Sequence, residues 1–302
     1  MVASKMPAAD VDVTIGLVRE LLAAQHPDLA DLGLRELANG WDNVLFRLGD
    51  DLTVRLPRRA AAAVLVQHEQ AWLPRLAPRL PVPVPVPLRV GRPGEGYPWA
   101  WSILPWLDGE TIGAAPVTNK TRLARDLGQF LGALHTPAPP DAPINPHRAG
   151  PLADRSAVTM KRIEELKAVV SDAGTIARRW LAAVTLDEWC GPAMWAHGDL
   201  HPLNLLQRDD RLAAVLDFGD VTSGDPANDL SVAWMLFDAG DREVFRAVAA
   251  TPVRPIDNMT WERARAWALS TAVLFLQASA DNPALHRVGE FTLAAVLADY
   301  AD

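Results

Sequence analysis

The sequence has a single cysteine, Cys190, and no apolar run long enough to cross a bilayer. One thiol cannot close a disulfide within the chain, so nothing points to an oxidising compartment. A membrane-spanning helix would need about 20 consecutive apolar residues. Residues 1–10 also lack the apolar stretch of a signal peptide. These absences predict a cytoplasmic globular protein, and 302 residues suffice for more than one lobe.

Positive charge is also scarce. The chain has 29 Lys and Arg residues against 37 Asp and Glu residues, a net charge of -8. A nucleic-acid-binding protein would need a basic face, so neither nucleic acid nor a membrane is an expected partner. Residues 1–107 hold 11 basic and 11 acidic side chains, so the whole excess lies in residues 108–302. That excess suits a cationic substrate steered to an acidic cleft, although catalytic acids and solvated helix surface would explain it equally well.

Residues 1–107 are predicted to form a small lobe rich in β-structure. Short β-type runs are separated by turn residues at 39–40 and 49–51, which favours an antiparallel meander. The segment 81–87 alternates Pro and Val, and proline removes backbone donors, so we expect an extended connector there. The predicted helices span residues 12–25 and 60–76, and the predicted strands span 34–37, 43–48, 52–56, 88–91 and 98–104.

Residues 108–302 are predicted to form a larger, mainly helical lobe. A Pro- and Ala-rich loop at 136–151 interrupts the helical pattern, and two short strands follow further on. The fold class is therefore α+β, with a lobe at 1–107, a lobe at 108–302 and a cleft suited to a nucleotide between them. The predicted helices span 120–135, 156–170, 175–184, 226–239, 241–250, 261–278 and 283–299, and the strands span 205–207 and 212–218.

One short stretch concentrates the polar chemistry. Residues 197–204 are His-Gly-Asp-Leu-His-Pro-Leu-Asn, and residues 216–220 are Leu-Asp-Phe-Gly-Asp at the end of a short apolar run. Asp199, Asn204 and Asp217 thus fall close together in sequence. Phosphoryl transfer requires a carboxylate that takes a hydroxyl proton and oxygen ligands for Mg²⁺. The pattern predicts a magnesium-dependent kinase of a small molecule.

These two motifs resemble the aminoglycoside phosphotransferase family, whose members have a protein-kinase-like fold. The similarity covers about residues 34–239, and residues 40–43 and 52–59 are similar to the macrolide phosphotransferase branch. The resemblance implies an ATP- or GTP-dependent phosphotransferase that acts on a hydroxyl of an aminoglycoside- or macrolide-type antibiotic, and thus antibiotic resistance. It also implies that Asp199 takes the hydroxyl proton while Asn204 and Asp217 hold Mg²⁺ on the nucleotide phosphates.

Three further residues are expected to support this loop and to take no part in the reaction. The resemblance implies that Asp229 fastens the loop from below through its backbone, and that His197 packs as a structural loop residue. His201 is expected to shape the loop in the same way. A zinc site at His197 and His201 is the alternative, but catalytic zinc needs about three protein ligands and no other histidine lies close in sequence.

The small lobe lacks the strand lysine with which a protein kinase holds phosphates. The four lysines, at positions 5, 120, 161 and 167, lie outside its predicted strands. Arg55 stands at the matching position, with Glu69 as the expected partner on the following helix. An arginine is always charged and can grip a phosphate with two N–H groups, so we assign the nucleotide role to Arg55. An ordinary surface ion pair is the alternative.

The small lobe also lacks a Gly-x-Gly-x-x-Gly loop. Gly40 and Asn43 occupy its place, where glycine permits close approach to a phosphate and the Asn43 side chain can form a hydrogen bond. A plain hairpin turn would have the same residues. The resemblance further implies that the strand containing Ser102, Ile103 and Leu104 pairs its backbone with the purine edge.

Two other functions are compatible with the same motifs. A kinase of a choline-, homoserine- or sugar-like metabolite would use identical machinery. A nucleotide-binding pseudokinase or scaffold would fit the replacement of lysine by Arg55 and the missing glycine-rich loop.

Overall fold

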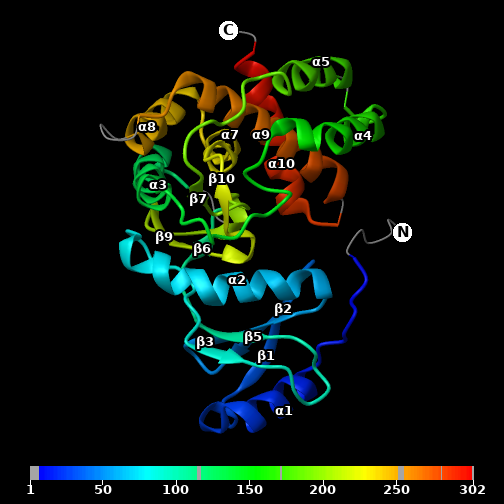
Figure 1. The fold of residues 1–302 in the computed structure, drawn as a ribbon, viewed down its shortest axis with the longest axis vertical. Coiled ribbons are helices and arrows are strands. Elements are labelled where there is room, and N and C mark those ends of the chain that lie inside the picture. Colours follow the sequence, from blue (N-terminus) through cyan, green and yellow to red (C-terminus); the bar gives the residue numbers. More distant parts are fainter. Residues whose placement is uncertain (1–6, 114–116, 171, 251–254, 280, 301–302) are drawn as a thin grey trace.

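The structure is a computed structural model of the chain, described for residues 7–113, 117–170, 172–250, 255–279 and 281–300. Residues 1–6, part of the stretch that lacks signal-peptide character, lie outside the described residues. Figure 1 shows a small lobe built on a sheet and a larger helical lobe above it. The predicted α+β fold, with a small antiparallel β lobe and a larger helical lobe, is confirmed.

The small lobe is a five-stranded sheet of order β1-β2-β3-β5-β4 in which all neighbours are antiparallel. Its first three strands form the expected meander. Along β2, Val44, Phe46 and Leu48 are buried and alternate with less buried residues, as the side-chain period of two requires. The strands are β1 (Leu34–Asn39), β2 (Asn43–Leu48), β3 (Leu52–Pro57), β4 (Arg89–Gly91) and β5 (Trp101–Pro105).

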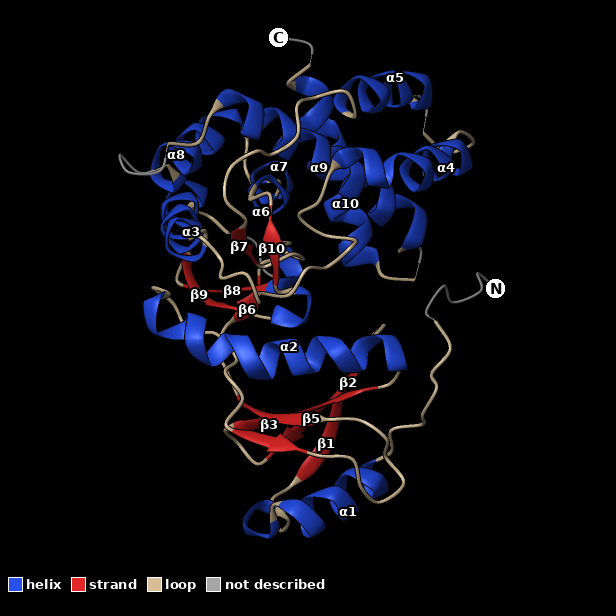
Figure 2. Ribbon diagram, viewed as in Figure 1, coloured by secondary structure: helices blue, strands red, loops and turns tan. Residues whose placement is uncertain are grey.

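Two helices cover the sheet. Helix α1 (Ile15–Gln25) begins at Thr14, whose hydroxyl accepts a hydrogen bond from the first turn, and buries Val18 and Leu21 in one core with the strands. Helix α2 (Ala60–Leu76) lies between the sheet and the helical lobe (Figures 1 and 2). Its Leu73 and Leu76 belong to the core of the helical lobe. Helix α2 therefore joins the two lobes by hydrophobic burial.

The helical lobe is organised around α9 (Asn258–Ala278), which packs against α4, α5, α6, α7 and α10. Asp257 caps this helix by accepting a hydrogen bond from Thr260 N at 2.7 Å. In the part of the chain that the structure describes, no helix is long and apolar enough to cross a membrane. The surrounding helices are α3 (Lys120–Leu134), α4 (Ser156–Leu166), α5 (Ala173–Ala183), α6 (Ala227–Leu230), α7 (Val232–Leu236), α8 (Ala239–Ala249) and α10 (Pro283–Ala298).

Two small sheets lie where the lobes meet and frame the predicted catalytic segment (Figure 2). One pairs β7 with β10, and the other has the order β6-β8-β9. The sequence predicted β8 and β9 but not the other three strands. The bounds are β6 (Glu110–Thr111), β7 (Met194–Ala196), β8 (Leu205–Arg208), β9 (Arg211–Val215) and β10 (Thr222–Gly224).

Three predicted elements end at least three residues earlier than expected: the helix predicted for 156–170 stops at Leu166, and the other two have a local cause. The strand predicted for 212–218 stops at Val215, because Asp217 adopts a left-handed conformation with φ of 57° that no strand accommodates. The helix predicted for 226–239 is divided into α6 and α7 at Ser231, whose hydroxyl donates to Asn228 O at 2.6 Å. It ends at Leu236 because Asp238 already caps α8.

Candidate active site

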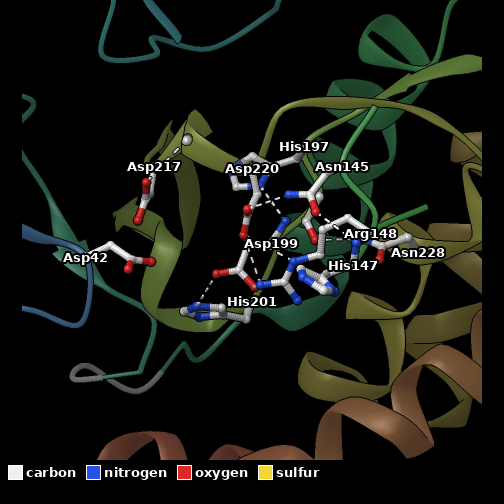
Figure 3. Close-up of polar contacts among 12 residues, drawn as sticks. Asp42, Asn145, His147, Arg148, His197, Asp199, His201, Asp217, Asp220 and Asn228 are labelled. Carbon is white, nitrogen blue, oxygen red and sulfur yellow. Dashed lines mark hydrogen bonds and ion pairs between the residues drawn. The ribbon is translucent and has the colours of Figure 1, made fainter. Parts of the chain in front are cut away.

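Asp199 lies on the loop between β7 and a short 3₁₀ turn at Pro202–Asn204, at the centre of the polar cluster in Figure 3. The preceding Gly198 has φ of 88°, which side chains of L-residues rarely adopt. A Cβ on Gly198 would lie 2.3 Å from Asp220 O. The turn that presents Asp199 therefore depends on glycine at this position.

Asp229, on α6, holds the start of the loop from the protein interior. Its carboxylate accepts hydrogen bonds from His197 N at 2.7 Å and from Gly198 N at 3.0 Å, and His135 Nε2 lies 3.2 Å away. Asp229 is fully buried. Burial acts to raise the pKa of Asp229, but its hydrogen bond to His135 and the positive charge there outweigh burial and lower that pKa. The carboxylate thus stays ionised beneath the loop.

The two histidines of the loop have backbone partners. His197 Nε2 donates to Leu216 O at 2.8 Å, and its Nδ1 accepts from Asp199 N at 3.2 Å, so both ring nitrogens are engaged. His201 Nδ1 accepts from Leu203 N at 3.2 Å. Among the residues that the structure describes, no three His, Cys, Asp or Glu side chains are grouped so that they could hold a metal ion. This arrangement matches loop support and offers no zinc ligand set.

Arg148 joins Asp199 to a second carboxylate, Asp220. Arg148 Nη2 lies 2.7 Å from Asp199 Oδ1 and 2.9 Å from Asp220 Oδ2, and its Nε donates to Asp220 Oδ2 at 3.1 Å (Figure 3). Burial works to raise the pKa of Asp199, but the charge of Arg148 and the nearby His201 hold that pKa well below its usual range. Burial raises the pKa of Asp220. Asp199 is therefore ionised near neutral pH.

Sequence reasoning did not identify Arg148 or Asp220 as site residues. Arg148 belongs to the Pro-rich loop at 136–151, where no periodicity or motif marks a single arginine. Asn145, in the same loop, donates to Asp220 Oδ1 at 2.8 Å. Asp220 itself closes the Asp-Phe-Gly-Asp motif, and this position was the one signal in the sequence that could have directed attention to it.

Asn204 and Asp217 lie on adjacent segments, because Leu216 N donates to Asn204 O at 2.8 Å. Asn204 Nδ2 donates to Asp199 O at 2.9 Å, and its Oδ1 accepts no hydrogen bond from any described residue. The Asp217 side chain is half exposed. An amide oxygen and a carboxylate with room for further ligands fit Mg²⁺, which prefers oxygen and keeps several waters.

Arg55 and Glu69 form a buried ion pair across the small lobe. Arg55 Nη1 lies 2.6 Å from Glu69 Oε2, and Arg55 Nη2 lies 3.2 Å from Asp217 Oδ1. Both side chains of the pair are almost completely buried, so the alternative of an ordinary surface pair is wrong. Burial raises the pKa of Glu69 despite its partner. A Cβ on Gly219 would lie 2.9 Å from Arg55 Nη2, so glycine there leaves room for the guanidinium.

Gly40 lies in the turn between β1 and β2, and Asn43 is the first residue of β2. Gly40 N donates to Asn43 O at 2.9 Å, which closes a tight hairpin, and Asn43 Oδ1 is buried without a hydrogen-bond partner. Asp42 in this turn forms an ion pair with Arg59. Figure 3 shows Asp42 and Asp217 on the same side of Asp199. The hairpin therefore lies toward the Asp217 side of the site.

The three residues of β5 that are expected to contact a purine differ in how many neighbouring strands they pair with. Ser102 and Ile103 each have β3 on one side and β4 on the other, so their backbone belongs to the sheet interior. Leu104 is paired with Thr53 of β3 alone. An open backbone edge for a base therefore begins only at Leu104.

The sequence profile of the phosphotransferase enzyme family matches residues 33–267. The fold is similar to that of the GDP and kanamycin complex of APH(2'')-IIIa, with a TM-score of 0.71, 19% identity, and 93% of this chain and 98% of that chain covered. It is also similar to macrolide 2'-phosphotransferase MphH from Brachybacterium faecium, with a TM-score of 0.60, 24% identity and coverage of 92% and 98%. Macrolide 2'-phosphotransferase type I gives a TM-score of 0.63, 21% identity and coverage of 96% and 98%. No protein among the curated sequences matches the chain.

Proposed function

The chain belongs to the phosphotransferase enzyme family, and we propose that it transfers the γ-phosphoryl group of ATP or GTP to a hydroxyl of a small molecule. The observation that carries this proposal is the arrangement around Asp199. Asp217 and Arg148 lie on opposite sides of Asp199 (Figure 3), Arg55 Nη2 lies 3.2 Å from the Asp217 carboxylate, and Asn204 Nδ2 donates to Asp199 O. Nucleotide phosphates belong on the first side, and the acceptor belongs on the second.

In this mechanism Asp199 orients the acceptor hydroxyl. Arg148 binds Oδ1 of Asp199, and Oδ2, which lies 3.6 Å from His201 Nε2, faces the hydroxyl. The hydroxyl oxygen forms a bond to the γ-phosphorus, the bond from that phosphorus to the bridging oxygen breaks, and the hydroxyl proton passes to Asp199. Because the pKa of Asp199 is held low, the proton moves late, and positioning contributes more than basicity.

The negative charge of the transferred group must be neutralised. Asn204 and Asp217 would hold Mg²⁺, which neutralises charge on the nucleotide phosphates. Arg55, held by Glu69 at 2.6 Å, directs its remaining N–H groups to the phosphates as the lysine of a protein kinase does. Gly40 and Asn43 close this side, and Leu104 offers its backbone to the base.

Two classes of acceptor follow from different observations. Structures of similar fold were solved with kanamycin and with gentamicin, so aminoglycosides, together with macrolides, are the first compounds to test. A small metabolite is the second class. It is favoured by two arginines near Arg148, namely Arg155 and Arg162, neither of which forms an ion pair with a described residue. Such a site suits an acceptor without positive charge.

The test measures consumption of Mg²⁺-ATP and Mg²⁺-GTP with aminoglycosides, macrolides and hydroxylated metabolites. Asp199→Asn is expected to lower kcat about 10²- to 10⁴-fold with any acceptor found. Asp217→Ala is expected to be at least as harmful, because electrostatic stabilisation of the transferred group dominates catalysis. Near-normal turnover by Asp217→Ala would contradict the mechanism. Nucleotide binding in a thermal-shift titration, without turnover over the whole panel, would favour a nucleotide-binding scaffold.

A further inference from the structure

Arg155 occupies an unusual position next to the proposed acceptor side of Asp199. It is the last residue before α4, and its Nη1 donates to His147 O at 2.6 Å, the carbonyl that precedes Arg148. Its guanidinium lies over the ring of Trp267, 4.9 Å from the ring centre. The aromatic floor and the backbone carbonyl fix the group in place, while its remaining N–H groups are not used by a carboxylate.

Arg162 stands on the same face of α4 as Arg155. The two positions are seven residues apart, or about two helical turns, so their side chains project in nearly the same direction. Between them Thr159 Oγ1 lies 3.0 Å from Ser270 Oγ of α9, which shows that this face is turned toward α9. Arg162 Nη1 is shielded from solvent and has no hydrogen-bond partner among the described residues.

Neither of these two arginines has an ion-pair partner of its own among the described residues. Arg148 is neutralised by Asp199 and Asp220, but neither Arg155 nor Arg162 has a carboxylate within ion-pair distance among the residues that the structure describes. Burial first, and then the positive charges of Arg148 and Arg162, lower the pKa of Arg155 to about 10. Burial likewise lowers the pKa of Arg162, and the negative charge of Glu165, which lies beyond ion-pair distance, acts in the opposite direction without outweighing burial. A partly desolvated guanidinium without a counter-ion is costly, and an anionic ligand would remove that cost.

We infer that Arg155 and Arg162 form an anion subsite for the acceptor, so that the phosphorylated molecule carries a carboxylate or phosphate group as well as its hydroxyl. The inference rests on the proposed function, because it assigns the acceptor to the Arg148 side of Asp199. Arginine forks match both oxyanions by paired hydrogen bonds. The two carboxylates Asp199 and Asp220 are both paired with Arg148, so neither forms an ion pair with Arg155 or Arg162.

A first experiment measures the anion subsite without turnover. Inorganic sulfate is titrated against sodium chloride of equal ionic strength, with Mg²⁺ and a non-hydrolysable nucleotide present, and the unfolding temperature is followed. Sulfate is expected to stabilise the wild-type protein saturably, and Arg155→Gln/Arg162→Gln is expected to lose this shift. The control Arg178→Gln changes an exposed arginine on α5 and should keep it. If the double variant does not fold, Arg162→Gln alone is expected to weaken sulfate binding about tenfold or more.

Absence of a sulfate-specific shift in the wild type, or an equal shift in the double variant, would overturn the inference. The unfolding temperature is measured with a non-hydrolysable nucleotide, so this result does not depend on catalysis.

A second experiment compares acceptors that share a scaffold and differ in charge. Nucleotide consumption is measured with four sets of hydroxylated compounds, which are cationic, neutral, carboxylate-bearing and phosphate-bearing. Their representatives are glucosamine, glucose, glucuronate and glucose 6-phosphate. Reaction with the carboxylate or the phosphate set, with KM raised about 10- to 100-fold in Arg162→Gln, is expected. Reaction only with cationic or neutral compounds would refute the anion subsite and leave the proposed function intact. Retained sulfate binding with no consumption by any compound would refute the proposed function instead.

Discussion

Replacing Asp229 by alanine should both destabilise the protein and disable the loop that carries Asp199. The Asp229 carboxylate accepts hydrogen bonds from the backbone N–H groups of His197 and Gly198 and lies 3.2 Å from His135. All of these contacts are buried. Each orphaned buried donor costs about 1–3 kcal/mol, and removal of one partner from a buried charged pair costs about 3–5 kcal/mol. These costs concern one buried carboxylate and overlap, so we expect Asp229→Ala to lower the free energy of unfolding by about 3–5 kcal/mol, a large share of a typical stability of about 5–15 kcal/mol.

The assay is equilibrium unfolding in urea, combined with phosphoryl-transfer activity at a temperature where the variant is folded. Asp229→Asn should lie between wild type and Asp229→Ala, because an amide oxygen can accept from one backbone N–H while its NH₂ group faces the other. Asp31→Asn, at an exposed site, serves as the control and should change neither quantity. The folded fraction of Asp229→Ala should still lose activity, since Asp199 is no longer held in place.

The contribution of Asp229 to the free energy of unfolding depends on pH, and the direction of this dependence follows from its pKa. The pKa of Asp229 is lowered in the folded protein, so this group contributes stability above the pKa of an unfolded aspartate, about 4. That contribution is lost as the pH falls through the folded pKa, and Asp229→Asn should lose less stability than wild type on acidification. A change of unfolding free energy below about 1 kcal/mol in Asp229→Ala, with normal activity, would refute the reasoning.

Two further predictions concern the arginines of the site. Arg55→Met should destabilise the protein by about 3–5 kcal/mol, because Glu69 is left buried and unpaired. Arg55→Lys should cost less, because it keeps a positive charge next to Glu69. Equal urea midpoints for the two variants would contradict this prediction. Arg148→Met should raise the pKa of Asp199, because the positive charge that favours its ionised form is gone, so the acidic limb of the pH–rate profile moves to higher pH. Arg148→Lys should move that limb less, and an unchanged profile in Arg148→Met would show that Arg148 does not act on Asp199.

Much of the fold followed from local patterns in the sequence. The meander of β1, β2 and β3 and the long helices have strong periodicity and clear turn residues, and their order was predicted correctly. Errors came where a single residue outweighs periodicity. Asp217 ends a strand because its backbone is left-handed, and Ser231 divides a helix through its hydroxyl. The very short strands β6, β7 and β10 have no period to detect, because they exist only through pairing with distant segments.

The sequence by itself determined which residues carry the proposed chemistry, since Asp199, Asn204 and Asp217 lie within one short stretch whose spacing is typical of phosphoryl transfer. Their orientation is a property of the tertiary structure. Asp229 contacts the loop across 32 residues, Arg148 reaches Asp220 across 72, and Arg155 reaches Ser270 across 115. Local propensity cannot specify such contacts, because they form only when helices far apart in the chain pack on one core. The cluster of Arg148, Arg155 and Arg162 arises in the same way, within a lobe whose overall charge is negative.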